Sequence, residues 1–174
     1  MPFVIVVCSD THSDRGHELE GAVREAVSSA SMVIHAGDFT SEAALEDFQD
    51  VTNRLVAVHG NADEPAVCER LPTRTVTEHG EVRVAVIHRP EGGEAGLAAF
   101  GRSEEADVVV FGHTHRPTLV ETGGPVLLNP GSHAQPRGNR PGFAAIETGG
   151  EGLSVTIREP DGTLIENYER SRGR

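Results

Sequence analysis

The chain has 174 residues, a hydrophobic fraction of 37% and a formal net charge of -12, from 27 acidic and 15 basic residues. This length suits one domain with a sizeable core, which we expect to span residues 1–174, with 170–174 frayed. The negative charge argues against a nucleic-acid backbone or an anionic membrane surface as the main partner. The sequence contains no run of 18 apolar residues and no signal peptide, so we expect a cytoplasmic protein without a membrane span. A homo-oligomer is compatible with this composition.

Every basic residue is arginine, and lysine is absent. Because lysine is normally among the commonest residues, this is a marked bias. An acidic, lysine-free surface suits a high-salt cytoplasm, and a halophilic source is therefore one hypothesis. A GC-rich genome, which exchanges lysine for arginine, explains the same composition equally well.

The first half of the chain alternates apolar runs with amphipathic segments. Residues 3–8 form a continuous apolar run, typical of a strand buried on both faces. Apolar residues from Leu19 to Ala30 recur at helical spacing, and Ser41 is placed to cap a second helix. Short apolar runs at 32–36 and 55–58 complete a β-α-β-α-β order. That order predicts a parallel sheet with right-handed crossovers.

The second half is richer in strands. We expect a hairpin of strands at 74–78 and 82–87, a short helix at 92–102 and a buried strand at 108–111. Further strands are expected at 118–121, 126–128, 143–146, 153–157 and 163–168. Leu153, Val155 and Ile157 alternate with polar residues, which predicts a half-buried strand in an antiparallel second sheet.

Metal-binding side chains follow the apolar runs, where the strands end. Ligands of parallel sheets bind beyond the C-terminal ends of the strands, so residues distant in sequence converge on one rim. The set comprises four imidazoles, two carboxylates and one amide: Asp10, His12, Asp38, Asn61, His88, His113 and His115. Such mixed nitrogen and oxygen ligands suit manganese, iron, nickel, zinc or cobalt better than calcium. Seven groups exceed the needs of one tetrahedral ion, but with Asp38 bridging they provide two sites of four ligands each.

A pair of divalent ions at this rim has a definite chemistry. Two ions about 3.5–4 Å apart clamp the attacking and leaving oxygens of an in-line displacement. Their charge exceeds that of the two aspartates, so the site attracts a phosphate into an otherwise acidic protein. The ions also lower the pKa of a bridging water, which becomes the nucleophile.

Four short motifs carry a family resemblance: Ser9-Asp10-Thr11-His12, Ala36-Gly37-Asp38, Gly60-Asn61-Ala62-Asp63 and Gly112-His113-Thr114-His115. Together they resemble the calcineurin-like metallophosphoesterase family. The later stretch Asn129-Pro130-Gly131-Ser132, with Gln135-Pro136-Arg137 and Arg140-Pro141, resembles its small bacterial and archaeal phosphodiesterase branch. The likeness extends over roughly residues 3–147. It implies an α/β fold, a four-layer α/β/β/α sandwich of two mixed sheets flanked by helices, with a dinuclear metal centre.

The resemblance also implies roles for the matched residues. One metal would be held by Asp10, His12, Asp38 and His115, and the other by Asp38, Asn61, His88 and His113. The expected cofactors are two divalent metal ions, manganese first, with nickel, iron, zinc, cobalt or magnesium as alternatives. The implied activity is hydrolysis of a small phosphate ester, foremost a diester, by a metal-bridging hydroxide, with Asn61 stabilising the developing charge.

Two departures from the family pattern affect catalysis. Many members have a histidine directly after the motif asparagine, where it acts as general acid, but here this position is Ala62. Asp63 is the substitute proton donor, or it caps the following helix or turn. Arg89 replaces a small residue beside His88, where it either clamps or obstructs phosphate. Arg137 and Arg140 are candidates for binding a second phosphoryl substituent of the substrate, with surface charges as the alternative.

Other readings of the chain stay open. A phosphomonoesterase is one alternative. A non-catalytic scaffold is another, because this fold also serves in a retromer subunit, although all seven ligand positions here carry coordinating residues. Among the remaining histidines, His35 and His59 are expected in the core or behind the ligands. His133 is expected either to line the site or to belong to the turn that begins at Asn129.

Overall fold

The computed structural model describes residues 3–150 and 152–171, which form two stacked mixed sheets. One sheet has the order β11 (Leu164–Ser171), β10 (Gly152–Arg158), β9 (Phe143–Gly149), β1 (Phe3–Cys8), β2 (Met32–His35) and β3 (Leu55–Ala57). The other has the order β4 (Arg74–His79), β5 (Val82–Ile87), β6 (Val108–Val110), β8 (Val126–Asn129) and β7 (Thr118–Glu121). The helices are α1 (Gly21–Ser29), α2 (Glu42–Val51), α3 (Pro65–Arg70) and α4 (Gly93–Ser103).

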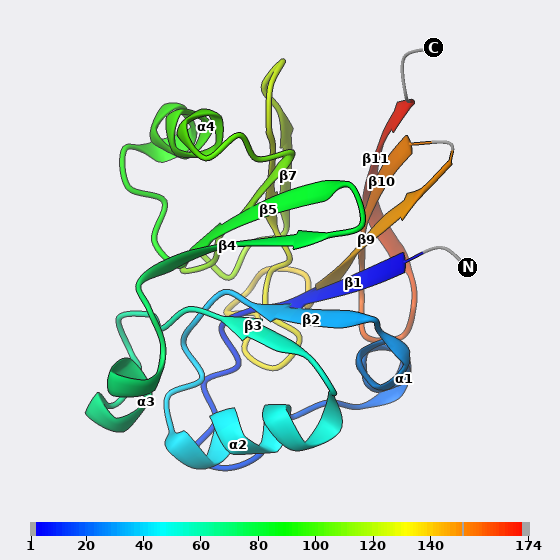
Figure 1. Cartoon of the computed structure of the whole chain (residues 1–174). Coiled ribbons are helices and arrows are strands. Elements are labelled where there is room, and N and C mark those ends of the chain that lie inside the picture. Colours follow the sequence, from blue (N-terminus) through cyan, green and yellow to red (C-terminus); the bar gives the residue numbers. More distant parts are fainter. Residues whose placement is uncertain (1–2, 151, 172–174) are drawn as a thin grey trace.

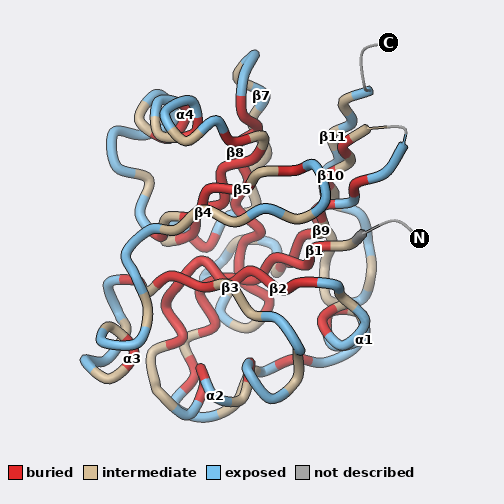
Figure 2. Tube along the Cα trace, in the orientation of Figure 1, coloured by how far each residue is buried: buried red, intermediate tan, exposed pale blue. Residues whose placement is uncertain are grey.

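The buried hydrophobic residues form three clusters, one between the two sheets and one on the outer face of each sheet. Alternate residues of β1 point to opposite faces, so Ile5 and Val7 pack between the sheets while Val6 and Cys8 pack against α1 and α2. On the outer face of the other sheet, residues of β6 and β8 pack against Leu97 of α4. Figure 1 shows α1, α2 and α3 below the first sheet and α4 above the second, and Figure 2 shows burial concentrated in the strands between them. The predicted four-layer α/β/β/α sandwich is therefore confirmed.

The parallel core of the first sheet matches the prediction. β1 pairs with β2 and β2 with β3, both in parallel. Ser41 caps α2, because its side chain accepts a hydrogen bond from the backbone N–H of Ala44 at 3.1 Å. The hairpin of β4 and β5 is antiparallel, and β5, β6 and β8 are parallel neighbours. Both sheets thus present parallel strand ends to the same region.

One strand assignment was wrong. The strand around residues 153–157 is antiparallel, but it belongs to the first sheet, since β9 pairs with β1 and β10 pairs with β9. Alternation shows that one face of a strand is buried, but not which sheet it joins. The buried side chains of Leu153, Val155 and Ile157 face the core between the sheets, and β9 occupies the free edge of β1.

The ends of several elements also differ from expectation. Helix α1 begins at Gly21, so the buried Leu19 lies before it, and α3 was anticipated only as a helix or turn. The strand β11 continues to Ser171, so Arg170 and Ser171 pair with β10 where fraying was expected, and residues 172–174 lie outside the described residues. The longest described helix, α4, has 11 residues, and no helix in the described ranges is long and apolar enough to cross a membrane.

Candidate metal centre

The expected ligands lie in loops that leave the C-terminal ends of parallel strands. Asp10 follows β1, Asp38 follows β2 and Asn61 follows β3, while the loops after β5 and β6 carry the histidines of the second sheet. Hydrogen bonds between main-chain groups join these loops, from the N–H of Asp10 to the carbonyl of Gly37 and from the N–H of His12 to that of Asp38, both at 3.0 Å. Topology therefore brings side chains that are about a hundred residues apart in sequence to one rim.

Five of the seven expected ligands have left-handed backbone conformations. Their φ angles lie between 46° and 73°: Asp10 56°, His12 46°, Asp38 61°, His113 73° and His115 57°. Non-glycine residues rarely adopt this conformation, and clusters of such strain occur where a functional site over-determines the backbone. The folded loops thus hold these side chains in place at a conformational cost that the surrounding structure offsets.

Glycines make room for the two carboxylates. A Cβ atom on Gly112 would lie 2.2 Å from Ser9 Oγ and 2.7 Å from Asp10 Oδ2, and one on Gly60 would lie 2.1 Å from Asp38 Oδ1. Neither glycine has a positive φ angle. Space beside the carboxylates, and not backbone freedom, therefore requires glycine at these two positions.

Asp10, His12 and His115 form a compact group capable of holding a metal. The Nε2 atom of His115 lies 3.5 Å from Asp10 Oδ1, and that of His12 lies 3.9 Å from the same oxygen. The Nδ1 atom of His115 donates to the carbonyl of Gln135, which leaves Nε2 as an electron-pair donor. Within the described part of the chain, the buried Nε2 atoms of His12 and His115 have no hydrogen-bond partner.

Asn61 stands between two of the histidines of the second sheet, His88 and His113. Its Oδ1 atom lies 3.1 Å from His88 Nε2 and 2.8 Å from His113 Nδ1. The other nitrogen of His88, Nδ1, donates to the carbonyl of Ala36 at 2.7 Å, so its Nε2 is again free to act as a ligand. The structure thus brings Asn61, His88 and His113 together as the sequence predicted.

Asp38 lies between the two predicted ligand sets. Its Oδ2 atom is 3.3 Å from His12 Nε2 and 3.2 Å from His88 Nε2. Bonds of about 2.0–2.2 Å to a shared ion place a nitrogen and an oxygen ligand roughly 3.0–3.4 Å apart, so these separations fit a metal between them. A second compact group contains Asp10, Asp38 and His88, and it shares Asp10 with the first. Both carboxylates are therefore placed to contact more than one ion.

The electrostatics favour a cation at this position. Asp10 and Asp38 are 0% and 2% exposed, and among the described residues their ion-pair partners are only histidines. Burial raises the pKa of Asp38, but the neighbouring imidazoles of His12 and His88 outweigh it and hold that pKa well below its usual range. Burial lowers the pKa of His88, yet the neighbouring Asp38 carboxylate raises it overall. Buried carboxylates without a permanent cation are costly, so the residues present fit bound divalent ions.

Buried polar groups brace the loops from behind. Asn129 donates to the carbonyl of Gly112 at 3.1 Å and to Thr114 Oγ1 at 3.0 Å, while Ser132 donates to the carbonyl of Asp10 at 2.7 Å. These bonds give the predicted turn at 129–132 a role behind the site. His35 is likewise buried, which agrees with the expectation that it lies in the core or behind the ligands. Its Nδ1 accepts from the N–H of Gly37 at 3.1 Å, and burial lowers its pKa well below the ordinary value.

The position of the expected proton donor is occupied by Ala62, followed by Asp63. Ala62 is exposed, and its N–H donates to Asp38 Oδ1 at 2.8 Å. The carboxylate of Asp63 accepts three backbone N–H groups, from Asp38 at 3.0 Å and from Thr40 and Gly60 at 2.7 Å each. Glu64, and not Asp63, is the residue at the N-cap of α3. The bonds to Asp63 tie the loop after β2 to the loop after β3.

The predicted substrate-binding arginines differ in their surroundings. Arg89 is exposed and lines a cavity of about 290 Å³ together with Asn61 and His88. Arg137 is exposed in the loop after Ser132, and it makes no ion pair with any residue in 3–150 or 152–171. Arg140 instead pairs with Glu159, at 2.7 Å between Nε and Oε1. Of these arginines, the structure places Arg89 beside the candidate centre.

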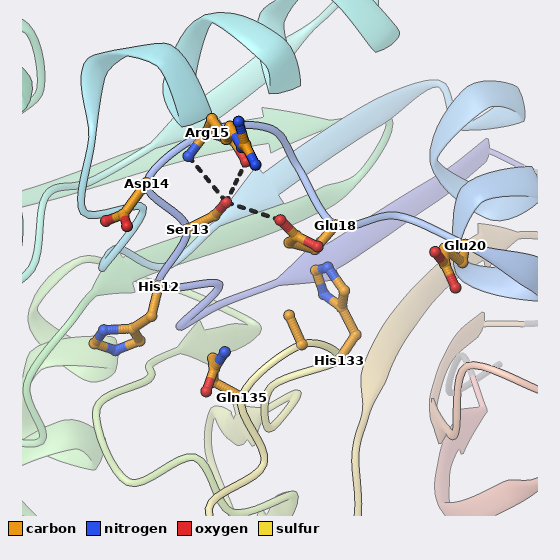
Figure 3. A pocket seen from close by; sticks show the side chains of 9 residues that line it. His12, Ser13, Asp14, Arg15, Glu18, Glu20, His133 and Gln135 are labelled. Atoms are coloured by element: carbon orange, nitrogen blue, oxygen red, sulfur yellow. Dashed lines mark hydrogen bonds between the residues drawn. The ribbon is translucent and has the colours of Figure 1, made fainter.

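His133 lines a separate polar cavity of about 440 Å³ that also touches His12 (Figure 3). Its Nε2 lies 3.1 Å from the carbonyl of His17, and burial lowers its pKa. Figure 3 shows Glu18 close to the His133 ring and Ser13 hydrogen-bonded to Glu18, at 2.9 Å. His133 therefore lines a neighbouring cavity that shares His12 with the ligand cluster.

Comparison with known proteins agrees with this geometry. Residues 3–151 match the calcineurin-like phosphoesterase superfamily domain. A probable metallophosphoesterase of Methanocaldococcus jannaschii is 37% identical over 139 residues, which is 77% of this chain and 70% of that protein. A phosphodiesterase of the same organism is 24% identical over 73% of this chain and 82% of its own length.

A solved structure supports the fold. Vacuolar Protein Sorting 29 from Cryptosporidium parvum superposes with a TM-score of 0.81 at 22% identity, covering 98% of this chain and 99% of that chain. The family match spans most of the sequence and includes all seven expected ligand positions. The chain therefore belongs to the calcineurin-like phosphoesterase superfamily.

Proposed function

We propose that the protein is a metal-dependent phosphodiesterase acting on a small phosphate ester. The observation that carries this proposal is the convergence of Asp10, Asp38 and four imidazoles on one rim, with buried nitrogen atoms that lack hydrogen-bond partners among the described residues. The family membership and the diesterase among its relatives support the same activity. The net charge of -12 supports a small substrate in preference to a nucleic acid or a membrane.

The proposed ligands fall into two sets that share Asp38. One set is Asp10, His12, Asp38 and His115, and the other is Asp38, Asn61, His88 and His113. Two divalent ions, manganese first, would supply Lewis acidity and an activated water when bound. Imidazole and carboxylate ligands suit such ions, and the tautomers fixed at His88 and His115 leave Nε2 available.

Asn61 is proposed to orient the substrate as well as to bind metal. Its Oδ1 faces the two imidazoles, while its amide NH₂ is without a protein acceptor among the described residues. That group is available to donate to a phosphoryl oxygen, where negative charge develops during the displacement. Arg89, exposed beside it, adds a permanent positive charge near the same oxygens.

The proton for the leaving group comes from water in this proposal. Ala62 has no proton to give, and Asp63 would lose backbone hydrogen bonds on protonation, because its oxygens already accept three of them. Esters with good leaving groups need little protonation, so activated aryl diesters should be better substrates than alkyl diesters. We therefore propose Asp63 as a residue that positions the loops.

A non-catalytic scaffold is the second candidate function, favoured by the likeness in fold to Vacuolar Protein Sorting 29. Metal-free protein supplied with Mn²⁺ and assayed on bis(p-nitrophenyl) phosphate and p-nitrophenyl phosphate separates the candidates. We expect hydrolysis of the diester in preference to the monoester. Intact metal binding without hydrolysis of either compound would favour the scaffold, and hydrolysis of the monoester alone would make the protein a phosphatase.

A further inference from the structure

The cavity of about 290 Å³ beside Asn61 and His88 has a charged wall that no role described above explains. Arg74, Arg89 and Glu91 all line it. Arg74 is the first residue of β4 and pairs across the hairpin with Ile87, the last residue of β5, so Arg74 and Arg89 flank the same end of the hairpin. Two arginine residues therefore line a cavity that they share with Asn61 and His88 of the candidate metal centre.

Both guanidinium groups keep their hydrogen-bond donors free. In the part of the chain that the structure describes, neither Arg74 nor Arg89 has a carboxylate within 4.0 Å. The guanidinium carbon of Arg74 lies 5.6 Å from the centre of the Phe100 ring, a cation–π contact that steadies the side chain without using its N–H groups. Each guanidinium offers five N–H donors in a planar fork that matches a carboxylate or a phosphate.

The local charge has the opposite sign to that of the whole protein. Arg74 and Arg89 outweigh Glu91 and leave a charge of +1 on this wall, whereas the chain carries -12. In an acidic protein, such a wall attracts anions to the mouth of the site.

We propose that this cavity binds the alcohol portion of the diester, and that this portion is compact and carries a second anionic group held by Arg74 and Arg89. The inference rests on the proposed function, because it names the substrate class of the same site. The volume lies near the lower limit of small-molecule sites, which favours a short carboxylated or phosphorylated alcohol over a nucleoside. Arg74 thereby becomes a specificity-determining residue outside the family motifs.

Calorimetric titration of the protein supplied with Mn²⁺ tests this inference. The probes are ethylphosphonate, 2-carboxyethylphosphonate and ethane-1,2-bisphosphonate, which share a phosphonate and differ in the second anion. We expect at least one of the two probes that carry a second anionic group to bind about fivefold more tightly than ethylphosphonate, as suits an exposed charge pair. A larger gain from the carboxylate or from the second phosphonate identifies which anion the wall prefers.

Two matched variants make the result specific. Arg74→Gln should reduce the preference to less than twofold, while Arg24→Gln, which removes an exposed charge from α1, should retain it. Equal losses in both variants, or no preference in the wild type, would overturn the inference. Hydrolysis of ethyl p-nitrophenyl phosphate is measured in parallel. Absence of hydrolysis with the preference intact refutes only the proposed function, and hydrolysis without the preference refutes only the assignment of the cavity.

Discussion

Replacement of Gly112 by alanine tests how closely the loops are packed around Asp10. The new Cβ would lie 2.2 Å from Ser9 Oγ and 2.7 Å from Asp10 Oδ2, whereas ordinary contact begins at 3.4 Å. To restore ordinary contact, Ser9 Oγ must move by 1.2 Å and Asp10 Oδ2 by 0.7 Å. Ser9 donates to Asp10 Oδ2 at 2.6 Å, so both shifts displace a proposed ligand.

The expected cost combines strain with weaker metal binding. Overpacking of this kind destabilises a protein by about 1–3 kcal/mol, which lowers the Tm by roughly 3–10 °C for a chain of this size. Displacement of a ligand by this distance should weaken Mn²⁺ binding by about 10- to 100-fold, the range seen when support for a ligand is lost. Thermal unfolding of the metal-free protein and Mn²⁺ titration measure the two effects separately.

Gly149→Ala is the matched control, because a Cβ there meets no atom within 4 Å and its φ angle is not in the left-handed region. It should leave both the Tm and the Mn²⁺ affinity unchanged. If Gly112→Ala bound Mn²⁺ within twofold of the wild type, the proposed place of Asp10 in the metal site would be refuted.

Three further predictions concern the missing proton donor, the loss of folding stability at acidic pH and a residue that braces the loops. Ala62→His should raise the rate on alkyl diesters by about 10- to 100-fold and leave aryl diesters nearly unchanged; an equal gain on both would contradict the missing-acid explanation. The pKa of Asp38 is depressed in the folded protein, so its contribution to stability is present above the unfolded value of about 4 and is lost as the pH falls through the lower folded value. Urea unfolding of the metal-free protein between pH 5 and pH 3 should show a smaller loss of stability for Asp38→Asn than for the wild type, and equal losses would be inconsistent with that linkage. Asn129→Ala leaves the carbonyl of Gly112 without this donor and should cost about 2–3 kcal/mol in denaturant unfolding, while Asn139→Ala, in the less buried loop, should cost less.

The positions of strands and ligands could be predicted from the sequence where they follow from the order of elements along the chain. The parallel β1, β2 and β3 were predictable from the alternation of apolar runs and amphipathic segments, and the strand-end rule then placed Asp10, Asp38 and Asn61 on one rim. The same rule placed the three ligand histidines that follow β5 and β6 at strand ends, and the family motifs assigned the ligands to two metal sites. Local signals sufficed because each ligand follows its strand directly.

Features that depend on tertiary packing could not be read in this way. The strand β10 shows a clear alternation, yet only its pairing with β9 places it in the first sheet. The three backbone hydrogen bonds to Asp63 come from two different loops, so sequence spacing gave no sign of them. Arg74 lies outside every motif, and only the hairpin register brings it to the cavity beside Asn61. These features depend on strand pairing and on contacts between loops, which local sequence patterns do not specify.

The central claim is that seven side chains form two metal sites sharing Asp38. The most direct test is the metal content of protein reconstituted with Mn²⁺, dialysed and measured by elemental analysis, in the wild type, His113→Ala and a His79→Ala control. We predict two ions per chain in the wild type and in the control, and fewer in His113→Ala, with the loss confined to one site. Retention of both ions and full activity by His113→Ala, or a wild type that holds no metal, would contradict it.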